Sequence, residues 1–314
     1  MKHRSKTILA LTAVTTVSLH IINRIQYSLS TKNNYLSDTE SLYYEWRFGK
    51  IHYTKKGKGT PVLLIHDLSV GSSEYEFKNL VNELSKNHEV FTLDLLGYGL
   101  SDKPNITYTN FLYVQLITEF IKNIIGKKTN IITSGDASSI AVMATHNDAN
   151  IINNLILINP QSLYQCNQIP SKQTKALKLL IETPILGTFL FNLVTTKSSF
   201  ENTFRNKYFG NSNNIEETDI LTYLESAHKK GYCSKYSFAS HSARYMNTNI
   251  IHALKEINNS IFILAGANKY DIETTVENYI YYNSAIEIAY VKNTKHLPHL
   301  EEPEEILSQI STFI

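Results

Sequence analysis

The stretch Asp94–Pro104 reads DLLGYGLSDKP and begins where a short apolar run, Val90–Leu93, ends. The apolar run has the length and composition of a buried strand, and the glycine-rich segment after it is typical of a turn. Ligands of open α/β sheets bind beyond the carboxyl ends of such strands. The residues directly after each predicted strand are therefore the first candidates for a functional site.

Short β-rich runs alternate with helical patterns through most of the chain. This alternation predicts a mostly parallel sheet with helices on both faces. Between Asn159 and about Ile250 the alternation stops and helical patterns dominate, which indicates a helical insertion. Besides a strand pair around Gly49, the expected strands are Pro61–Ile65, Val90–Leu93, Asn130–Thr133, Leu155–Ile158, Ile261–Leu264 and Ile286–Val291.

Composition excludes several classes of protein. Of the 314 residues, 42% are hydrophobic and 18% are charged, which is enough apolar material for a sizeable core and excludes a disordered chain. The net charge is only +2 and no basic stripe is visible, so no nucleic-acid partner is expected. Cys166 and Cys233 form no CxxC pair, which argues against a thiolate zinc site and favours free thiols. We expect no cofactor and no metal.

The amino-terminal segment has a basic start, Lys2–Lys6, followed by a mainly apolar stretch, Thr7–Ile22. This pattern predicts a membrane anchor or signal segment over residues 1–22, with a polar tether over residues 23–40. An anchor with its basic end inside would place the body on the extracytoplasmic side, and a cleaved signal would make the protein secreted. The stretch is shorter than the roughly 20 residues of a full span, so an ordinary packing helix stays an alternative.

Five segments after the predicted strands, taken in order, resemble the α/β-hydrolase family. The most specific are DLLGYGLSDKP and the ending KHLPHLEEPE. The resemblance implies an α/β-hydrolase fold with a helical cap: core over residues 41–159, cap over residues 160–250, and core again over residues 251–314. The five segments are His66–Leu68, Asp94–Pro104, Ser134–Ser139, Ala265–Asp271 and Lys295–His299.

The family's nucleophile stands on a sharp strand-to-helix turn, which requires small residues two positions before and after it. In this turn Asp136 meets that rule, between Ser134 and Ser138. An aspartate there resembles the epoxide hydrolases and haloalkane dehalogenases of the family. A carboxylate suits displacement at a saturated carbon, which gives an alkyl-enzyme ester. The alternative is that Asp136 only caps the helix.

The resemblance also implies the remaining catalytic groups. His296 would activate water, and the backbone N–H groups of Leu68 and Ala137 would form the oxyanion hole. The dehalogenases have tryptophan where this chain has Ala137, so an epoxide-hydrolase-like reaction is favoured. Lys269 stands where the family's acid is expected, and Asp271 can orient His296 only if the loop is longer or bulged.

Asp67, where the family has glycine, is a third departure beside Asp136 and Lys269. We therefore expect a hydrolase that acts on a small, hydrophobic substrate. The alternative is a hydrolase-like binding protein with impaired catalysis.

Overall fold

The structure, a computed structural model, describes residues 2–36 and 41–314. Its centre is an eight-stranded sheet with the order β1-β2-β4-β3-β5-β6-β7-β8. The strands from β4 to β8 in this order run parallel, whereas β2 pairs antiparallel with both β1 and β4. The strands are β1 (Leu42–Trp46), β2 (Gly49–Lys56), β3 (Thr60–Ile65), β4 (His88–Leu93), β5 (Thr129–Ser134), β6 (Ile152–Ile158), β7 (Ile261–Gly266) and β8 (Glu287–Val291).

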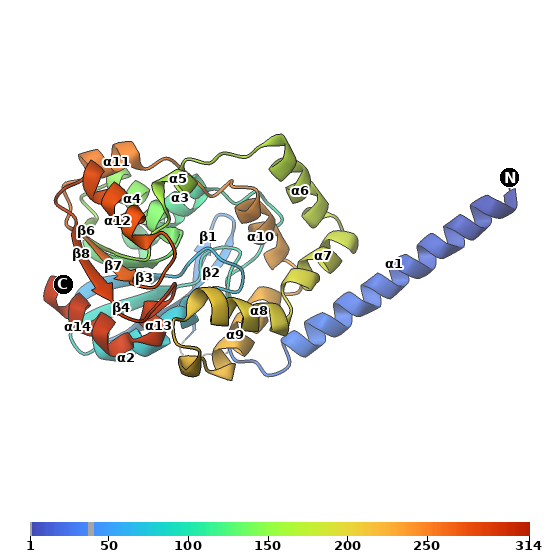
Figure 1. Ribbon diagram of the computed structural model, residues 1–314, viewed down its shortest axis with the longest axis horizontal. Coiled ribbons are helices and arrows are strands. Elements are labelled where there is room, and N and C mark those ends of the chain that lie inside the picture. The colour runs from blue at the N-terminus through green and yellow to red at the C-terminus, as the bar shows by residue number, and fades with distance from the viewer. Residues whose placement is uncertain (1, 37–40) are drawn as a thin grey trace.

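Helices cover both faces of this sheet, as the alternation predicts (Figure 1). One buried cluster joins the sheet to α3, α4, α11 and α12, and a second joins its other face to η1, α2 and α14. The central strands are buried on both faces, which is why they read as continuous apolar runs. These elements are η1 (Glu74–Phe77), α2 (Lys78–Leu84), α3 (Asn110–Phe120), η2 (Ile121–Ile125), α4 (Ala137–Asn147), α11 (Ile251–Glu256), α12 (Ile272–Tyr282), α13 (Pro298–Glu301) and α14 (Pro303–Phe313).

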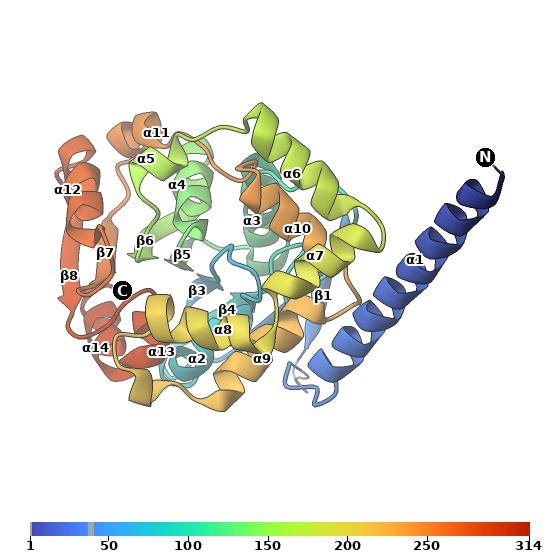
Figure 2. The same ribbon diagram turned by 45° about the vertical axis from the view of Figure 1, so that its right-hand side comes forward.

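A helical layer lies between β6 and β7 in the sequence and forms its own apolar cluster around Phe204 and Tyr223. Figure 2 shows these helices on one side of the sheet. The layer is the helical cap that the family resemblance implies. Its elements are α5 (Leu163–Cys166), α6 (Lys172–Glu182), α7 (Leu186–Val194), α8 (Lys197–Thr203), η3 (Phe204–Tyr208), η4 (Ser212–Asn214), α9 (Glu217–His228) and α10 (Ser234–Ser242).

The amino-terminal helix α1 (Lys2–Ser30) projects away from the body in both views (Figures 1 and 2). The expected boundary at residue 22 is not a break, because the helix continues to Ser30. Its end is attached to the cap: the Asn23 amide donates to the Ile185 carbonyl, and the Asn192 amide donates to the Asn23 side chain. Residues 37–40 of the predicted tether lie outside the described residues.

In the described part of the chain no single helix has the length and apolarity of a membrane span. The bent pair α6 and α7, with 104° between its members, passes the same test by length and composition.

Candidate active site

The loop after β3 brings Asp67 to the carboxyl end of the sheet. Its backbone is held by two buried side chains. The Asp67 N–H donates to Glu76, and the Asp67 carbonyl lies 2.6 Å from Nδ1 of His66. The other ring nitrogen of His66 accepts from the Leu95 N–H at 3.0 Å, which joins this loop to the start of the Asp94–Pro104 stretch. His66 thus supports the loop.

Both oxygens of the Asp67 carboxylate have partners. Oδ1 accepts from the N–H of Leu68 at 2.7 Å and from the N–H of Asp136 at 2.8 Å. Oδ2 lies 3.0 Å from Nε2 of His296. Burial is the largest single effect on the pKa of Asp67 and acts to raise it. The hydrogen bonds from His296 and from the Asp136 N–H, together with the charges of His296 and His241, outweigh burial and hold the pKa below the ordinary value. Asp67 is therefore an anion at neutral pH.

The turn from β5 to α4 makes its sharp bend at Gly135, which has φ +56°. Asp136 has φ −68° and ψ −21°, which is ordinary helical backbone at the position that caps α4. A Cβ atom added to Gly135 would overlap Oδ1 of Asp67. The elbow side chain is thus missing, and the Asp67 carboxylate fills the space that it would take.

The Asp136 carboxylate lies 2.9 Å from Nε2 of His241, which α10 of the cap contributes. Burial is the largest single effect on the pKa of His241 and acts to lower it, but the hydrogen bond to Asp136 and the negative charges of Asp136 and Asp67 together outweigh burial and raise the pKa. The predicted pairing of Asp136 with His296 is not the one that the structure makes, because Nε2 of His296 meets Asp67. Asp136 still borders the site through its backbone N–H.

The His296 ring stacks on Tyr208 of the cap, with ring centroids 5.3 Å apart. The Asn159 amide holds the histidine loop by donating to the carbonyls of Lys295 and His296. His296 is therefore positioned from both the core and the cap.

The expected triad acid does not reach His296 in the described residues. Asp271 is exposed at the start of α12. Lys269 donates to the carbonyls of Asn159 and Pro160, and burial lowers its pKa to about 8. The carboxylate on His296 is supplied from the β3 loop instead.

Of the two N–H groups expected in an oxyanion hole, that of Leu68 donates to Oδ1 of Asp67. The other N–H that donates to this oxygen is that of Asp136 rather than that of Ala137. This shift by one residue follows from the bend at Gly135. Sequence reasoning missed Glu76 and His241, and it treated Asp67 only as a departure from the family pattern. One signal was available in the sequence. Gly135 has no side chain in the elbow turn, and Asp67 adds a side chain where the family has glycine, so the second change can fill the space that the first leaves empty.

Glu76 is a second buried carboxyl group beside Asp67. Tyr223 donates to its Oε1, and Oε2 accepts the Asp67 N–H. Burial, followed by the negative charge of Asp67, raises the pKa of Glu76 to about 8. Two buried acids with pKa values displaced in opposite directions are typical of functional sites.

Comparison with known proteins agrees with this architecture. Residues 62–309 match the model of the alpha/beta hydrolase family. The chain belongs to that family, and its relatives support a hydrolase.

A similar curated relative is the 2-hydroxy-6-oxo-6-(2'-aminophenyl)hexa-2,4-dienoic acid hydrolase of Metapseudomonas resinovorans. It is 34% identical over 115 residues, which are 35% of this chain and 39% of the relative. The soluble epoxide hydrolase of Corynebacterium sp. (strain C12) is 24% identical over 110 residues, 35% of this chain and 38% of that protein. The matched stretches thus span less than half of either relative.

A solved serine hydrolase involved in carbazole degradation shares the fold, with a TM-score of 0.70 and 16% identity. The superposition covers 87% of this chain and 97% of that one.

Proposed function

We propose that this protein hydrolyses a small, apolar substrate through a covalent ester on Asp67. The observation that carries the proposal is the binding of one carboxylate by two backbone N–H groups on Oδ1 and by His296 on Oδ2. In this arrangement Oδ2 is the attacking oxygen and Oδ1 already lies in the oxyanion hole. The nucleophile that was expected at Asp136 is supplied from the opposite side of the same site.

In the first step, Oδ2 of Asp67 attacks a saturated carbon and the bond from that carbon to the leaving oxygen breaks. The leaving oxygen takes a proton from the His241 imidazolium, the form that the neighbouring Asp136 carboxylate favours by raising the pKa of His241. Asp136 holds His241 in place for this transfer. A leaving oxygen that needs a proton indicates an epoxide or a similarly strained ether rather than a halide.

In the second step, His296 takes a proton from water, and the resulting hydroxide attacks Cγ of Asp67. Negative charge develops on Oδ1, where the N–H groups of Leu68 and Asp136 are already aligned. Collapse breaks the ester bond, returns the His296 proton to the departing alkoxide and regenerates the carboxylate. The product is a diol, and the proton released by ester hydrolysis restores His241.

Single turnover in heavy-oxygen water tests this route. The substrates are a panel of aryl and alkyl epoxides, with an alkyl halide and a p-nitrophenyl ester for comparison. We expect one heavy oxygen in the peptide that carries Asp67 and none in the peptide that carries Asp136. Asp67→Asn abolishes turnover, whereas Asp136→Asn retains part of it. Label on the Asp136 peptide would instead make Asp136 the nucleophile.

The geometry also favours one other function. The alternative is a hydrolase-like protein that binds its ligand without catalysis. In such a protein the Asp67 carboxylate, bonded on both oxygens, would permanently occupy the oxyanion hole. Absence of turnover and of label across the whole panel would support this hydrolase-like binding protein.

We further propose that α1 attaches the protein to a membrane by lying in the bilayer interface. Apart from the adjacent pair Ile21 and Ile22, its exposed large apolar residues follow one another at three- and four-residue intervals, so they share one face of the helix. Lys6 and Arg24, both exposed, flank this face and can meet anionic headgroups. The residues of the face are Leu11, Val14, Val17, Ile21, Ile22, Ile25 and Leu29.

Flotation with anionic vesicles tests the attachment. Val14→Asp and Val17→Asp should each reduce the bound fraction, while Thr16→Asp, on the opposite face, should leave it unchanged. Equal binding of all three variants would contradict the proposal. Deletion of residues 2–18 is the preferred truncation, since it spares Asn23 and its contacts with the cap.

A further inference from the structure

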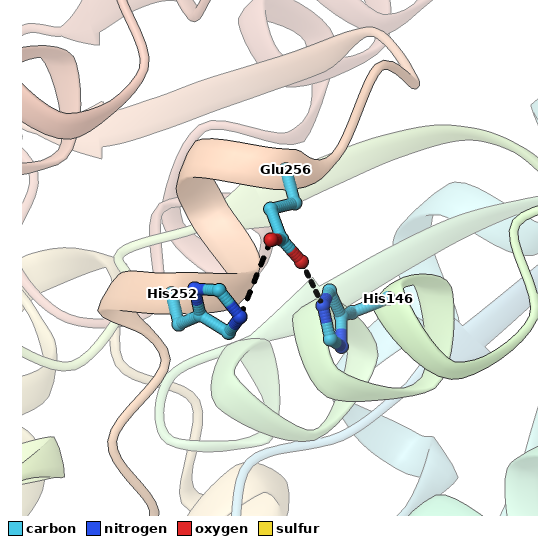
Figure 3. A group of neighbouring side chains, drawn as sticks. All are labelled: His146, His252 and Glu256. Carbon is cyan, nitrogen blue, oxygen red and sulfur yellow. Dashed lines mark hydrogen bonds and ion pairs between the residues drawn. The ribbon is translucent and has the colours of Figure 1, made fainter.

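A group of three metal-compatible side chains lies on the surface away from the candidate active site. His146 is near the end of α4, and His252 and Glu256 belong to α11 (Figure 3). The potential ligand atoms of the three residues all lie within 4.8 Å of one another. The group depends on the tertiary structure, because β6 and the whole cap separate His146 from the other two in the sequence.

The three side chains converge on one point. Nε2 of His146 lies 2.8 Å from one oxygen of Glu256, and Nε2 of His252 lies 3.3 Å from the other. His252 and Glu256 are four residues apart on one helix, which places them on the same face. Figure 3 shows both imidazoles directed at the carboxylate between them.

We propose that His146, His252 and Glu256 form a binding site for a divalent transition-metal ion of the zinc type. Two imidazoles and one carboxylate are a ligand set that zinc uses in proteins, with bonds of about 2.0–2.2 Å. Around a tetrahedral ion such ligand atoms lie roughly 3.4 Å apart. Because the ligand atoms here are already within 4.8 Å of one another, the side chains need to move only a short distance to bind an ion. Nitrogen ligands favour zinc over magnesium and calcium, which prefer oxygen.

The exposure of the three side chains suits this movement. The side chains of His146, His252 and Glu256 are 28%, 77% and 51% exposed, so their torsions can adjust without disturbing the core. Water reaches the group and can occupy the remaining coordination position.

The site has a structural consequence. The helix α11 is anchored in the core through its buried residues Ala253 and Leu254. A bound ion would join α11 to the end of α4, whose other end carries the Asp136 N–H of the candidate active site. The 11 residues of α4 put these ends about 16 Å apart. We therefore expect the ion to stabilise the fold and to leave the chemistry at Asp67 unchanged.

Calorimetric titration of the untagged full chain with zinc sulfate tests the proposal. We expect one zinc ion to bind per chain, and we expect that excess magnesium does not displace it. His146→Ala, His252→Ala and Glu256→Gln should each weaken zinc binding by at least about tenfold, the lower limit seen when only the partners of metal ligands are changed. His20→Ala removes an exposed histidine elsewhere and should bind like the unaltered protein.

Thermal unfolding gives a second readout. Zinc should raise the Tm of the unaltered protein and of His20→Ala, because an ion that binds only the folded state stabilises it. The three site variants should keep their metal-free Tm and lose the zinc-dependent increase. Absence of zinc binding, or equal zinc affinity in all variants, would show that the group is only a hydrogen-bonded surface cluster.

Discussion

Two turns at the carboxyl end of the sheet each carry an aspartate, and the two carboxylates have different surroundings. Asp67, after β3, is 5% exposed and faces His296 from the core. Asp136, after β5, is 26% exposed and faces His241 from the cap. They touch through a single backbone hydrogen bond from Asp136 to Asp67. The surroundings of each carboxylate therefore depend on the backbone conformation of the two turns, and on the space that Gly135 leaves for Asp67.

The difference arises from one residue. Gly135 adopts φ +56° and leaves the elbow without a side chain, so Asp67 enters the vacant space. Asp136 then begins the helix and points toward the cap. In the proposed function, the turn after β3 provides the nucleophile that the family pattern places in the turn after β5.

The first test removes the base on the Asp67 side. His296→Gln should lower turnover by about 10²–10⁴-fold, because no other group among the described residues is placed to activate water on the Asp67 ester. The first step needs no base, so the ester should accumulate. Mass spectrometry of the quenched reaction measures it on the Asp67 peptide. Failure to detect an ester while turnover is lost would point to a non-covalent route.

The second test concerns the Asp136 side of the comparison. His241→Gln should lower turnover of epoxides by about 10²-fold, the lower end for general acid catalysis. The raised pKa of His241 predicts that turnover of the unaltered protein falls as pH rises through that pKa, since the acid form is lost. The variant should lack this alkaline limb. An unchanged pH profile would mean that His241 only positions Asp136.

The third test concerns the space that Gly135 leaves for Asp67. Gly135→Ser places a side chain against Asp67 at a strained φ and should cost about 1–3 kcal/mol of unfolding free energy. Adding Asp67→Gly removes the overlap, so the double variant should recover about 0.5–3 kcal/mol of that loss. Denaturant unfolding of both single variants and the double variant gives the coupling. Strict additivity would contradict the shared space.

The fourth test concerns Glu76. Its raised pKa, about 8, means that it contributes stability that is complete below the ordinary carboxyl pKa and is lost as pH rises through the raised value. The free energy of unfolding should decline toward alkaline pH by at most about 1.4 kcal/mol per pH unit. Glu76→Gln should flatten this decline while Tyr223→Phe retains it. Equal pH profiles for Glu76→Gln and the unaltered protein would refute the role.

The strand–helix alternation and the DLLGYGLSDKP stretch predicted the sheet, the cap and the family, because strand burial and turn chemistry are local properties of the sequence. The position of His296 in its loop was also predictable from a local motif. Asp271 was a weaker prediction because Lys269 occupies the expected acid position, and in the structure Asp271 lies exposed at a helix start. Asp136 satisfied the small-residue rule of the elbow, but that rule does not say which residue bends.

The order of strands and helices, and the loops that meet at one edge of the sheet, could be predicted from local sequence patterns. The carboxylate that faces the imidazole of His296 could not, because it depends on packing across three loops and the cap. The same holds for His241 and Glu76, which lie far along the chain from the residues they contact. Hydrophobic periodicity is a property of neighbouring residues in the sequence, whereas the partner of a buried charge is brought to it only when the chain folds.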